Sequence, residues 1–254
     1  SHEPGSTFKL VDLIAVLDDK KADTSTVYDS KGGRIEYYGR SVKDSNGKGY
    51  GKISLARGFE LSSNTVLVQS VYDSYKNNPK QFVDRINSYG LNKPLGLPIK
   101  GEGKPVIPQP GTNRWSGVAL PWMAFGYGLS VTPLQTLTLY NAVANDGVMV
   151  KPIFVSEIKE WNKTIKKYNT EVINPKICSQ ETLDKVQAVL ENVVKRGTGS
   201  KLYSKDFSMA GKTGTAQVNY KDKSKLYYAS SFVGYFPADE PKYSCIIVVH
   251  KPNV

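Results

Sequence analysis

A mostly apolar run over residues 8–17 is the feature that most constrains how this chain can fold. It follows the Pro4-Gly5 break and ends at a polar stretch of two aspartates and two lysines. At the period of an α-helix, its apolar side chains fall on nearly every side. Such a helix is stable only when other elements enclose it. We therefore predict a buried central helix that begins at about Ser6.

The rest of the chain changes from helical to strand-like patterns along its length. We predict further helices from Ser62, near 80–89, from Thr132 to about 144 and over about 180–195, hairpins and loops over 24–52, a long irregular loop over 95–117, and a terminal hairpin of strands 229–235 and 243–249. Helices first and strands last favour an α+β fold over a regular βαβ repeat. With 254 residues, the chain fits one large domain or two small ones.

Composition excludes several classes of protein. With 39% hydrophobic residues the chain can form a core, so it is not disordered. No apolar stretch is long enough to span a bilayer, and no signal peptide is visible. The net charge of +11 is spread along the chain without an aromatic-interleaved basic stripe, so we predict no nucleic-acid partner. A surface near anionic membrane or wall polymer accounts for this charge. Cys178 and Cys245 have no metal-site spacing, which leaves buried thiols or a disulfide.

The segment Ser6-Thr7-Phe8-Lys9 carries the first chemical signal. Positions i and i+3 share a helix face, so the hydroxyl of Ser6 and the amine of Lys9 can meet. Lys9 is the only basic residue between Glu3 and Lys20. Burial lowers the pKa of an amine, which suits Lys9 to accept a proton from Ser6. Free N–H groups at the helix start can bind a developing oxyanion. The structural alternative is a serine cap followed by a surface lysine.

Two more short motifs follow along the chain. Ser62-Ser63-Asn64 places a hydroxyl and an amide just before an apolar helix, where both can point into one cleft; the alternative is a cluster of helix-capping residues. Residues 212–217 read Lys-Thr-Gly-Thr-Ala-Gln. A glycine on a strand edge lets a substrate backbone pair with it, while the lysine and threonine side chains favour a carboxylate. The alternative is a turn-rich edge strand.

In this order, the motifs form the Ser-x-x-Lys, Ser-x-Asn and Lys-Thr-Gly series of penicillin-binding proteins and class A β-lactamases. The chain resembles the transpeptidase domain of class B penicillin-binding proteins over nearly its whole length. The resemblance extends to residues 3–9, 125–135, 196–199 and 210–217. Glu-Pro-Gly before Ser6 and the loop 127–130 are more similar to the division-type enzyme than to the elongation-type one.

The spacing of the motifs argues against a β-lactamase. The gap from Ser62 to Lys212 is longer than the roughly 100 positions expected in class A β-lactamases. None of the glutamates between these motifs has the context of the residue that activates a deacylating water in those enzymes. We therefore expect a slowly deacylating acyl-enzyme.

The resemblance implies an α+β transpeptidase fold, in which helices flank an antiparallel sheet and an all-helical subregion carries the nucleophile helix. It implies that Ser6 attacks the penultimate D-alanine of a stem peptide, and that Lys9 takes the hydroxyl proton. Ser62 then protonates the leaving amine and Asn64 orients the substrate amide. Backbone N–H groups of Ser6 and Thr215 form the oxyanion hole. The full implied set is Ser6, Lys9, Ser62, Asn64 and Lys212 as catalytic residues, with Thr213, Gly214, Thr215 and Gln217 as substrate-binding residues.

The resemblance also implies partners and a location. The ligands are peptidoglycan stem peptides that end in D-Ala-D-Ala and the β-lactams that mimic them. A membrane glycosyltransferase and division proteins are the implied protein partners, and no metal or organic cofactor is needed. We expect the chain, 1–254, to be an incomplete domain that lacks the first strands and the terminal helix, anchored on the outer face of the cytoplasmic membrane by an upstream segment. The alternatives are a D,D-carboxypeptidase or β-lactamase-type hydrolase, and a β-lactam sensor.

Overall fold

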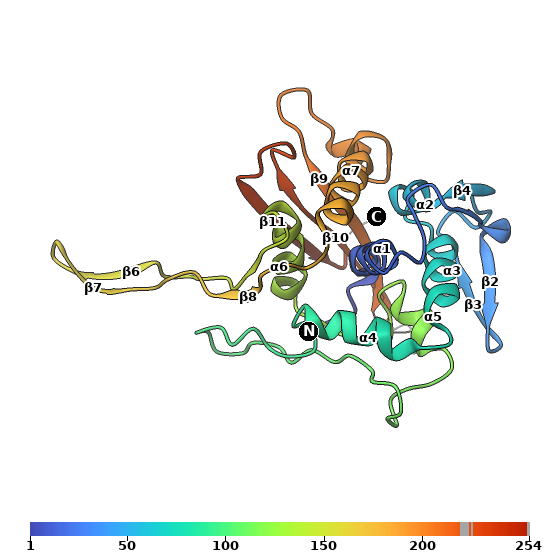
Figure 1. The fold of residues 1–254 in the computed structure, drawn as a ribbon, viewed down its shortest axis with the longest axis horizontal. Helices are drawn as coiled ribbons and strands as arrows, with labels where there is room; N and C mark the ends of the chain where they lie inside the picture. Colours follow the sequence, from blue (N-terminus) through green and yellow to red (C-terminus); the bar gives the residue numbers. More distant parts are fainter. Residues whose placement is uncertain (219–223, 225, 253–254) are drawn as a thin grey trace.

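In the computed structural model, which describes residues 1–218, 224 and 226–252, the predicted central helix lies at the middle of the molecule. Helix α1 (Lys9–Asp18) continues from the 3-10 turn η1 (Gly5–Phe8). Its apolar side chains are almost completely inaccessible to solvent. Figure 1 shows α1 end-on between the main sheet and a group of helices. This confirms the buried helix, although Ser6 itself lies in the 3-10 turn.

The main sheet is antiparallel and three-stranded among the described residues, in the order β11-β10-β9. Strand β9 (Ala210–Val218) is an edge strand next to β10 (Tyr227–Phe236), which pairs with β11 (Tyr243–His250). Helices α6 (Pro133–Ala144) and α7 (Gln180–Arg196) pack against this sheet (Figure 1). The predicted terminal hairpin and both helices are therefore confirmed, as is the α+β class.

A helical group covers the other side of α1. It consists of α2 (Leu55–Glu60), α3 (Asn64–Tyr75), α4 (Pro79–Ser88) and α5 (Ala119–Met123). Helices α3 and α4 confirm the predicted ones. Helices α2 and α5 were not predicted, because elements this short complete too few turns to display a helical period. Both lie largely buried against the core. Residues 95–117 contain no helix or regular strand, as predicted.

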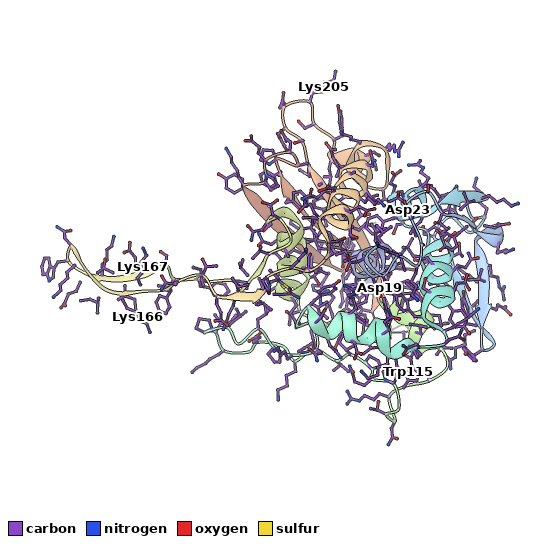
Figure 2. All side chains as sticks on the ribbon, in the orientation of Figure 1. Asp19, Asp23, Trp115, Lys166, Lys167 and Lys205 are labelled. Atoms are coloured by element: carbon purple, nitrogen blue, oxygen red, sulfur yellow. The ribbon has the colours of Figure 1, made fainter. Side chains whose placement is uncertain are left out.

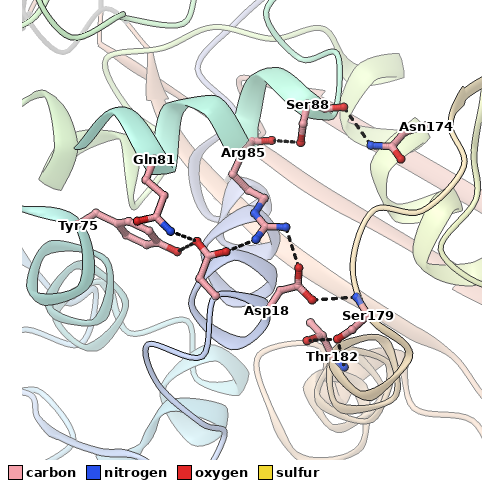
Figure 3. Close-up of polar contacts among 9 residues, drawn as sticks. Asp18, Tyr75, Gln81, Arg85, Ser88, Asn174, Ser179 and Thr182 are labelled. Carbon is pink, nitrogen blue, oxygen red and sulfur yellow. Dashed lines mark hydrogen bonds and ion pairs between the residues drawn. The ribbon is translucent and has the colours of Figure 1, made fainter. Parts of the chain in front are cut away.

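The end of α1 is fixed by a polar network at the start of the next loop (Figure 3). Arg85 of α4 donates to Asp18 at 2.7 Å and also pairs with Asp19. Tyr75 donates to the Asp19 carboxylate, and the Ser179 N–H donates to Asp18. Burial opposes ionisation of Asp18, but the hydrogen bonds from Ser179 and Arg85 outweigh it and lower the pKa of this carboxyl. The network joins α1 to both α4 and α7.

In the part of the chain that the structure describes, four small two-stranded sheets lie around the core. They pair β1 (Val27–Asp29) with β4 (Lys52–Ser54), β2 (Arg34–Tyr37) with β3 (Arg40–Lys43), β5 (Met149–Val150) with β8 (Val172–Asn174), and β6 (Glu157–Glu160) with β7 (Lys163–Lys167). The pair β2–β3 confirms a predicted hairpin within 24–52, whereas β1 and β4 pair across the whole segment and are not a hairpin. Strands β6 and β7 form an arm that extends away from the body, with Lys166 and Lys167 along it (Figures 1 and 2).

Candidate active site

The three motifs, far apart in the sequence, meet beside the start of α1. Lys9 Nζ lies 2.7 Å from Asn64 Oδ1 and 3.2 Å from Ser62 Oγ. On the other side, η1 packs against β9: a methyl group added to Gly214 would lie 2.9 Å from Thr7 Cγ2. The structure thus brings the Ser-x-x-Lys, Ser-x-Asn and Lys-Thr-Gly segments into one region, as the sequence predicted.

The turn that carries Ser6 is shaped by glycines and by backbone contacts. Gly5 has a φ of 57°, a left-handed conformation that glycine adopts without a steric penalty. Its N–H donates to the carbonyl of Gly126 at 3.1 Å. A Cβ on Gly126 would lie 2.0 Å from the Gly5 carbonyl oxygen, so only glycine allows this approach. The next residue, Thr7, donates its hydroxyl to the Pro4 carbonyl at 2.9 Å. These contacts hold Ser6 at the mouth of a groove, partly exposed.

Lys9 is fully buried at the first position of α1. Its amine lies within 2.8 Å of the Ser62 carbonyl and 2.7 Å of the Asn64 side-chain oxygen. Burial lowers the pKa of Lys9 to about 7, although Asp44 and Asp12 raise it in part. A neutral amine has two N–H donors, and these two oxygens match them. The lone pair is then left for a hydroxyl, which is the arrangement a general base requires.

Ser62 lies in an unusual backbone conformation that aims its hydroxyl at Lys9. Its φ is 57°, in the left-handed region that residues other than glycine rarely adopt. The turn ends α2 with N–H bonds from Ser62 to the carbonyl of Phe59 and from Ser63 to that of Gly58, a left-handed helix cap. Ser63 then caps α3 through a bond from the Val66 N–H. The predicted capping role therefore belongs to Ser63, while Ser62 and Asn64 contact Lys9.

Sequence reasoning missed Asp44, the residue that anchors this turn. Its buried carboxylate accepts hydrogen bonds from the hydroxyls of Ser63 and Thr65 and from the Thr65 N–H at 3.0 Å. The adjacent carbonyl of Lys43 accepts from Asn64 Nδ2 at 2.7 Å. The end of β3 therefore positions the Ser-x-Asn motif from both sides. The sequence around Asp44 does not predict this contact, because Asp44 follows a short hairpin strand and belongs to no recognisable motif.

Lys212 is the second fully buried lysine of the site. Its amine donates to the carbonyl of Thr213 at 3.0 Å and lies 5.7 Å from the centre of the Phe59 ring. Burial lowers the pKa of Lys212 well below its ordinary value, and the charge of nearby Lys9 lowers it further. The hydroxyl of the next residue, Thr213, lies 2.6 Å from that of Thr198.

The free edge of β9 presents backbone groups at alternate residues. In an antiparallel pair, the N–H and carbonyl of one residue point to the same side. The Thr215 carbonyl faces η1, since a Cβ on Gly5 would lie 3.2 Å from it. Two residues further along, the Gln217 N–H donates to the hydroxyl of Tyr127 at 2.9 Å. Thr215 and Gln217 are exposed and both line the groove, so they are accessible to a ligand.

A groove of about 580 Å³ runs past these residues. Ser6, Asn64, Thr215 and Gln217 line it together with aromatic side chains and part of β3. The full lining is Ser6, Arg40, Ser41, Lys43, Asp44, Ser45, Asn64, Trp122, Phe125, Tyr127, Thr215, Gln217 and Tyr228. The groove is therefore continuous with the hydroxyl of the first motif, the amide of the second and the strand edge of the third.

Asp12 is a second residue that sequence reasoning missed. It is fully buried in α1, and neither carboxylate oxygen has a hydrogen-bond partner among the described residues. Burial raises the pKa of Asp12 well above its ordinary value, and the charge of Lys9, one helical turn away, opposes this rise only in part. Burial thus favours the protonated form of Asp12, one turn along α1 from the site lysine. Its signal in the sequence is an acidic residue within an otherwise apolar run.

Within the described ranges, no cluster of three or more metal-ligating side chains occurs, and no helix is long and apolar enough to cross a membrane. Cys178 and Cys245 are both free thiols, which excludes the disulfide alternative and leaves Cys178 as a buried thiol. Burial raises the pKa of both thiols.

The fold and the three juxtaposed motifs define a serine acyl-transfer domain of the penicillin-recognising type. The family described as penicillin binding protein transpeptidase domain matches residues 1–253, and the chain belongs to this family. The expected resemblance and the transpeptidase fold are confirmed.

Two relatives align with all or nearly all of this chain. Stage V sporulation protein D of Bacillus subtilis is 29% identical over 260 residues, which are 100% of this chain and 39% of the relative. Peptidoglycan D,D-transpeptidase FtsI of Escherichia coli is 28% identical over 99% of this chain and 40% of its own length. The chain therefore spans about two fifths of the length of these relatives.

Solved structures agree with this assignment. The D,D-transpeptidase domain of a peptidoglycan glycosyltransferase from Eggerthella lenta matches 99% of this chain and 61% of its own, with a TM-score of 0.87 and 29% identity. Penicillin-binding protein 3 of Mycobacterium tuberculosis, in complex with aztreonam, matches 99% of this chain and 57% of its own, with a TM-score of 0.85 and 28% identity.

Proposed function

We propose that this chain is the catalytic domain of a peptidoglycan D,D-transpeptidase, which cross-links stem peptides through an acyl-enzyme on Ser6. The observation that carries the proposal is the contact of Lys9 with both Ser62 and Asn64 at the head of the groove that Ser6 lines. A buried amine with a pKa of about 7 can exchange protons with hydroxyls at neutral pH.

Acylation begins when Ser6 Oγ attacks the carbonyl of the penultimate D-alanine and Lys9 accepts the hydroxyl proton. A C–O bond forms as the peptide C–N bond breaks. The proton passes through Ser62, whose hydroxyl lies 3.2 Å from Lys9 Nζ, to the departing D-alanine amine. Asn64 holds Lys9 through its oxygen, and its Nδ2 is fixed on the Lys43 carbonyl. An amine from a neighbouring strand then takes the acyl group from Ser6 by the reverse proton transfers.

The strand edge supplies the binding groups. The N–H groups of Ser6 and Thr215 form the oxyanion hole, which the approach of η1 to the Thr215 edge supports. The terminal carboxylate lies at Lys212 and at the hydroxyls of Thr213 and Thr215. An anionic ligand favours the charged form of a lysine, so carboxylate binding restores the proton that burial removes from Lys212. Gly214 allows the close packing on Thr7, and Gln217 continues the edge.

A β-lactam mimics the D-Ala-D-Ala end, acylates Ser6 and leaves slowly. The likeness of the chain to FtsI supports the division-type assignment, and with it an upstream membrane anchor, a glycosyltransferase partner and work at the outer face of the cytoplasmic membrane.

Intact-mass measurement after incubation with benzylpenicillin tests the proposal. The wild-type chain should gain the mass of one penicillin, and Ser6→Ala should gain none. An adduct that survives in Ser6→Ala would remove Ser6 as the nucleophile. Timing the loss of the adduct separates transpeptidase from hydrolase: persistence for many minutes supports the transpeptidase, whereas release within seconds identifies a hydrolase.

A further inference from the structure

The arm of β6 and β7 belongs neither to the core nor to the catalytic groove. It extends away from the body, with Lys166 and Lys167 along it (Figures 1 and 2). Every residue of both strands is exposed. Of the residues that the structure describes, those that line the groove with Ser6 come from other segments. A two-stranded ribbon by itself is at best marginally stable in water, so a surface that covers this one would stabilise it.

The end of the arm presents apolar surface to water. Trp161 begins the turn between β6 and β7, and 94% of its surface is exposed. Ile158 and Ile165 of the same strands are 46% and 55% exposed. Trp115 and Trp122, by contrast, pack against the core. An indole in water lacks the free energy that its burial in an apolar medium would supply. The body of the protein leaves this burial to another surface.

The glutamates of the arm each have a lysine next to them. The two strands contain four lysines and two glutamates. Glu157 Oε1 lies 2.7 Å from Lys159 Nζ. Glu160 is directly opposite Lys163 in the register of β6 and β7, a placement that favours opposite charges. Two lysines therefore remain in excess.

These two are Lys166 and Lys167. Neither forms an ion pair with another residue of the described ranges, and both are exposed. The amine of Lys166 lies 4.7 Å from the centre of the Tyr168 ring. Adjacent residues of a strand point to opposite faces, so one lysine lies on each face of the ribbon. Cations on both faces behind an aromatic tip suit a partner that surrounds the end of the ribbon.

We infer that the tip of the β6–β7 arm docks into the surface of an anionic phospholipid bilayer. Trp161 enters the headgroup region, the level at which the tryptophans of membrane proteins gather. Lys166 and Lys167 reach the lipid phosphates, while their stems lie along apolar surface. A soluble polyanion would satisfy the lysines alone and leave Trp161 in water. A protein partner needs a contiguous apolar patch at the centre of the contact, whereas Ile158 and Ile165 each adjoin a charged residue.

Vesicle binding tests the inference. Vesicles of equimolar phosphatidylglycerol and phosphatidylcholine, or of phosphatidylcholine alone, are mixed with the intact chain, and the bound fraction is measured by sedimentation. The anionic vesicles should bind the chain more tightly and shift its tryptophan emission to shorter wavelength. Lys166→Gln and Lys167→Gln should each lower the partition coefficient about fivefold, and Trp161→Ser about tenfold. The lysine effects should be smaller at high salt.

The Lys20→Gln, Lys21→Gln double variant is the matched control, because these adjacent lysines are exposed and their replacement removes the same net charge as Lys166→Gln, Lys167→Gln. It should bind within about twofold of wild type, since salt screens charges that lie more than a Debye length from the bilayer. Trp161→Tyr should keep most of the binding and lose the wavelength shift. Equal losses in the two double variants would show general charge attraction and overturn the docking site.

Three further results would overturn the inference. The first is absence of binding to the anionic vesicles, and the second is equal binding to both kinds of vesicle. The third is a chain that binds inorganic polyphosphate but not vesicles, which would assign the arm to a soluble polyanion. All the substituted side chains are exposed, so each variant should keep the wild-type unfolding midpoint. No readout requires reaction at Ser6, so failure here is distinguishable from failure of the proposed function.

Discussion

Lys9 and Lys212 are two fully buried lysines that share one site, and the charge of Lys9 lowers the pKa of Lys212. Burial is the larger cause for both amines. Two ammonium groups cannot both remain charged in such surroundings without an anion between them. Burial and the repulsion between the two charges therefore both favour a neutral amine in the free site, and a neutral Lys9 can accept a proton.

The pKa of about 7 for Lys9 predicts a pH profile for acylation. Only the unprotonated amine can accept the Ser6 proton, so the rate constant with benzylpenicillin should rise about tenfold per pH unit below pH 7 and level off above it. A fluorescent-penicillin assay between pH 5 and 9 measures the profile. Lys9→Met should lose acylation at every pH, while Lys80→Met, an exposed control, should match wild type. A rate that falls between pH 6 and 8 would contradict the role of Lys9 as base.

The left-handed backbone of Ser62 predicts an unusual order of stability. Both Ser62→Gly and Ser62→Ala remove the hydroxyl near Lys9, so both should slow acylation to the same degree. Glycine lacks the steric penalty of this conformation, so Ser62→Gly should be more stable than Ser62→Ala by about 1 kcal/mol. Chemical denaturation measures the difference. The same substitutions at Lys20, an exposed residue with a φ of 53°, should show the same order without any change in acylation. A Ser62→Ala protein at least as stable as Ser62→Gly would refute the strain.

Asp44 predicts a coupled loss of stability and activity. Its carboxylate accepts bonds from Ser63 and Thr65, and Asn in its place would present an N–H₂ group to these donors. Asp44→Asn should lower the free energy of unfolding by about 2–3 kcal/mol and slow acylation, because the Ser62 and Asn64 turn loses its anchor. Asp73→Asn, at an exposed position, is the control. Normal acylation by a folded Asp44→Asn protein would show that the turn is held without this carboxylate.

Asp12 predicts a pH dependence of stability. Its pKa is raised on folding, so above the unfolded value of about 3.9 the unfolded chain releases a proton that the folded chain retains. Stability from this group is therefore lost as the pH rises from about 4 toward the folded pKa. Asp12→Asn carries no such proton, so its stability relative to wild type should increase with pH by up to about 1.4 kcal/mol per unit. Denaturation at pH 4, 5.5 and 7 tests this, with Asp84→Asn as control. A constant difference would mean that Asp12 is ionised in the folded protein.

Patterns of short range predicted much of this protein correctly. The period of residues 8–17 indicated an enclosed helix, and helices α3, α4, α6 and α7 followed from the same signal. Runs of β-branched and aromatic residues on either side of a turn indicated the hairpin of β10 and β11. The arm of β6 and β7 gave no such signal, because all of its residues are exposed and no buried face imposes a period of two. Helices α2 and α5 were too short to show a period.

The candidate site likewise has one part that the sequence predicted and another that only the structure revealed. The sequence by itself determined which groups exist and which segments carry them, since the order Ser-x-x-Lys, Ser-x-Asn and Lys-Thr-Gly can be read from residues alone. Only the tertiary structure decided the pKa of Lys9, the anchoring of the second motif by Asp44 and the groove that Ser6 and Asn64 share. The physical reason is range: helical periods and turns arise from neighbours a few residues apart, whereas desolvation and a shared cavity depend on segments that meet only after the chain has folded.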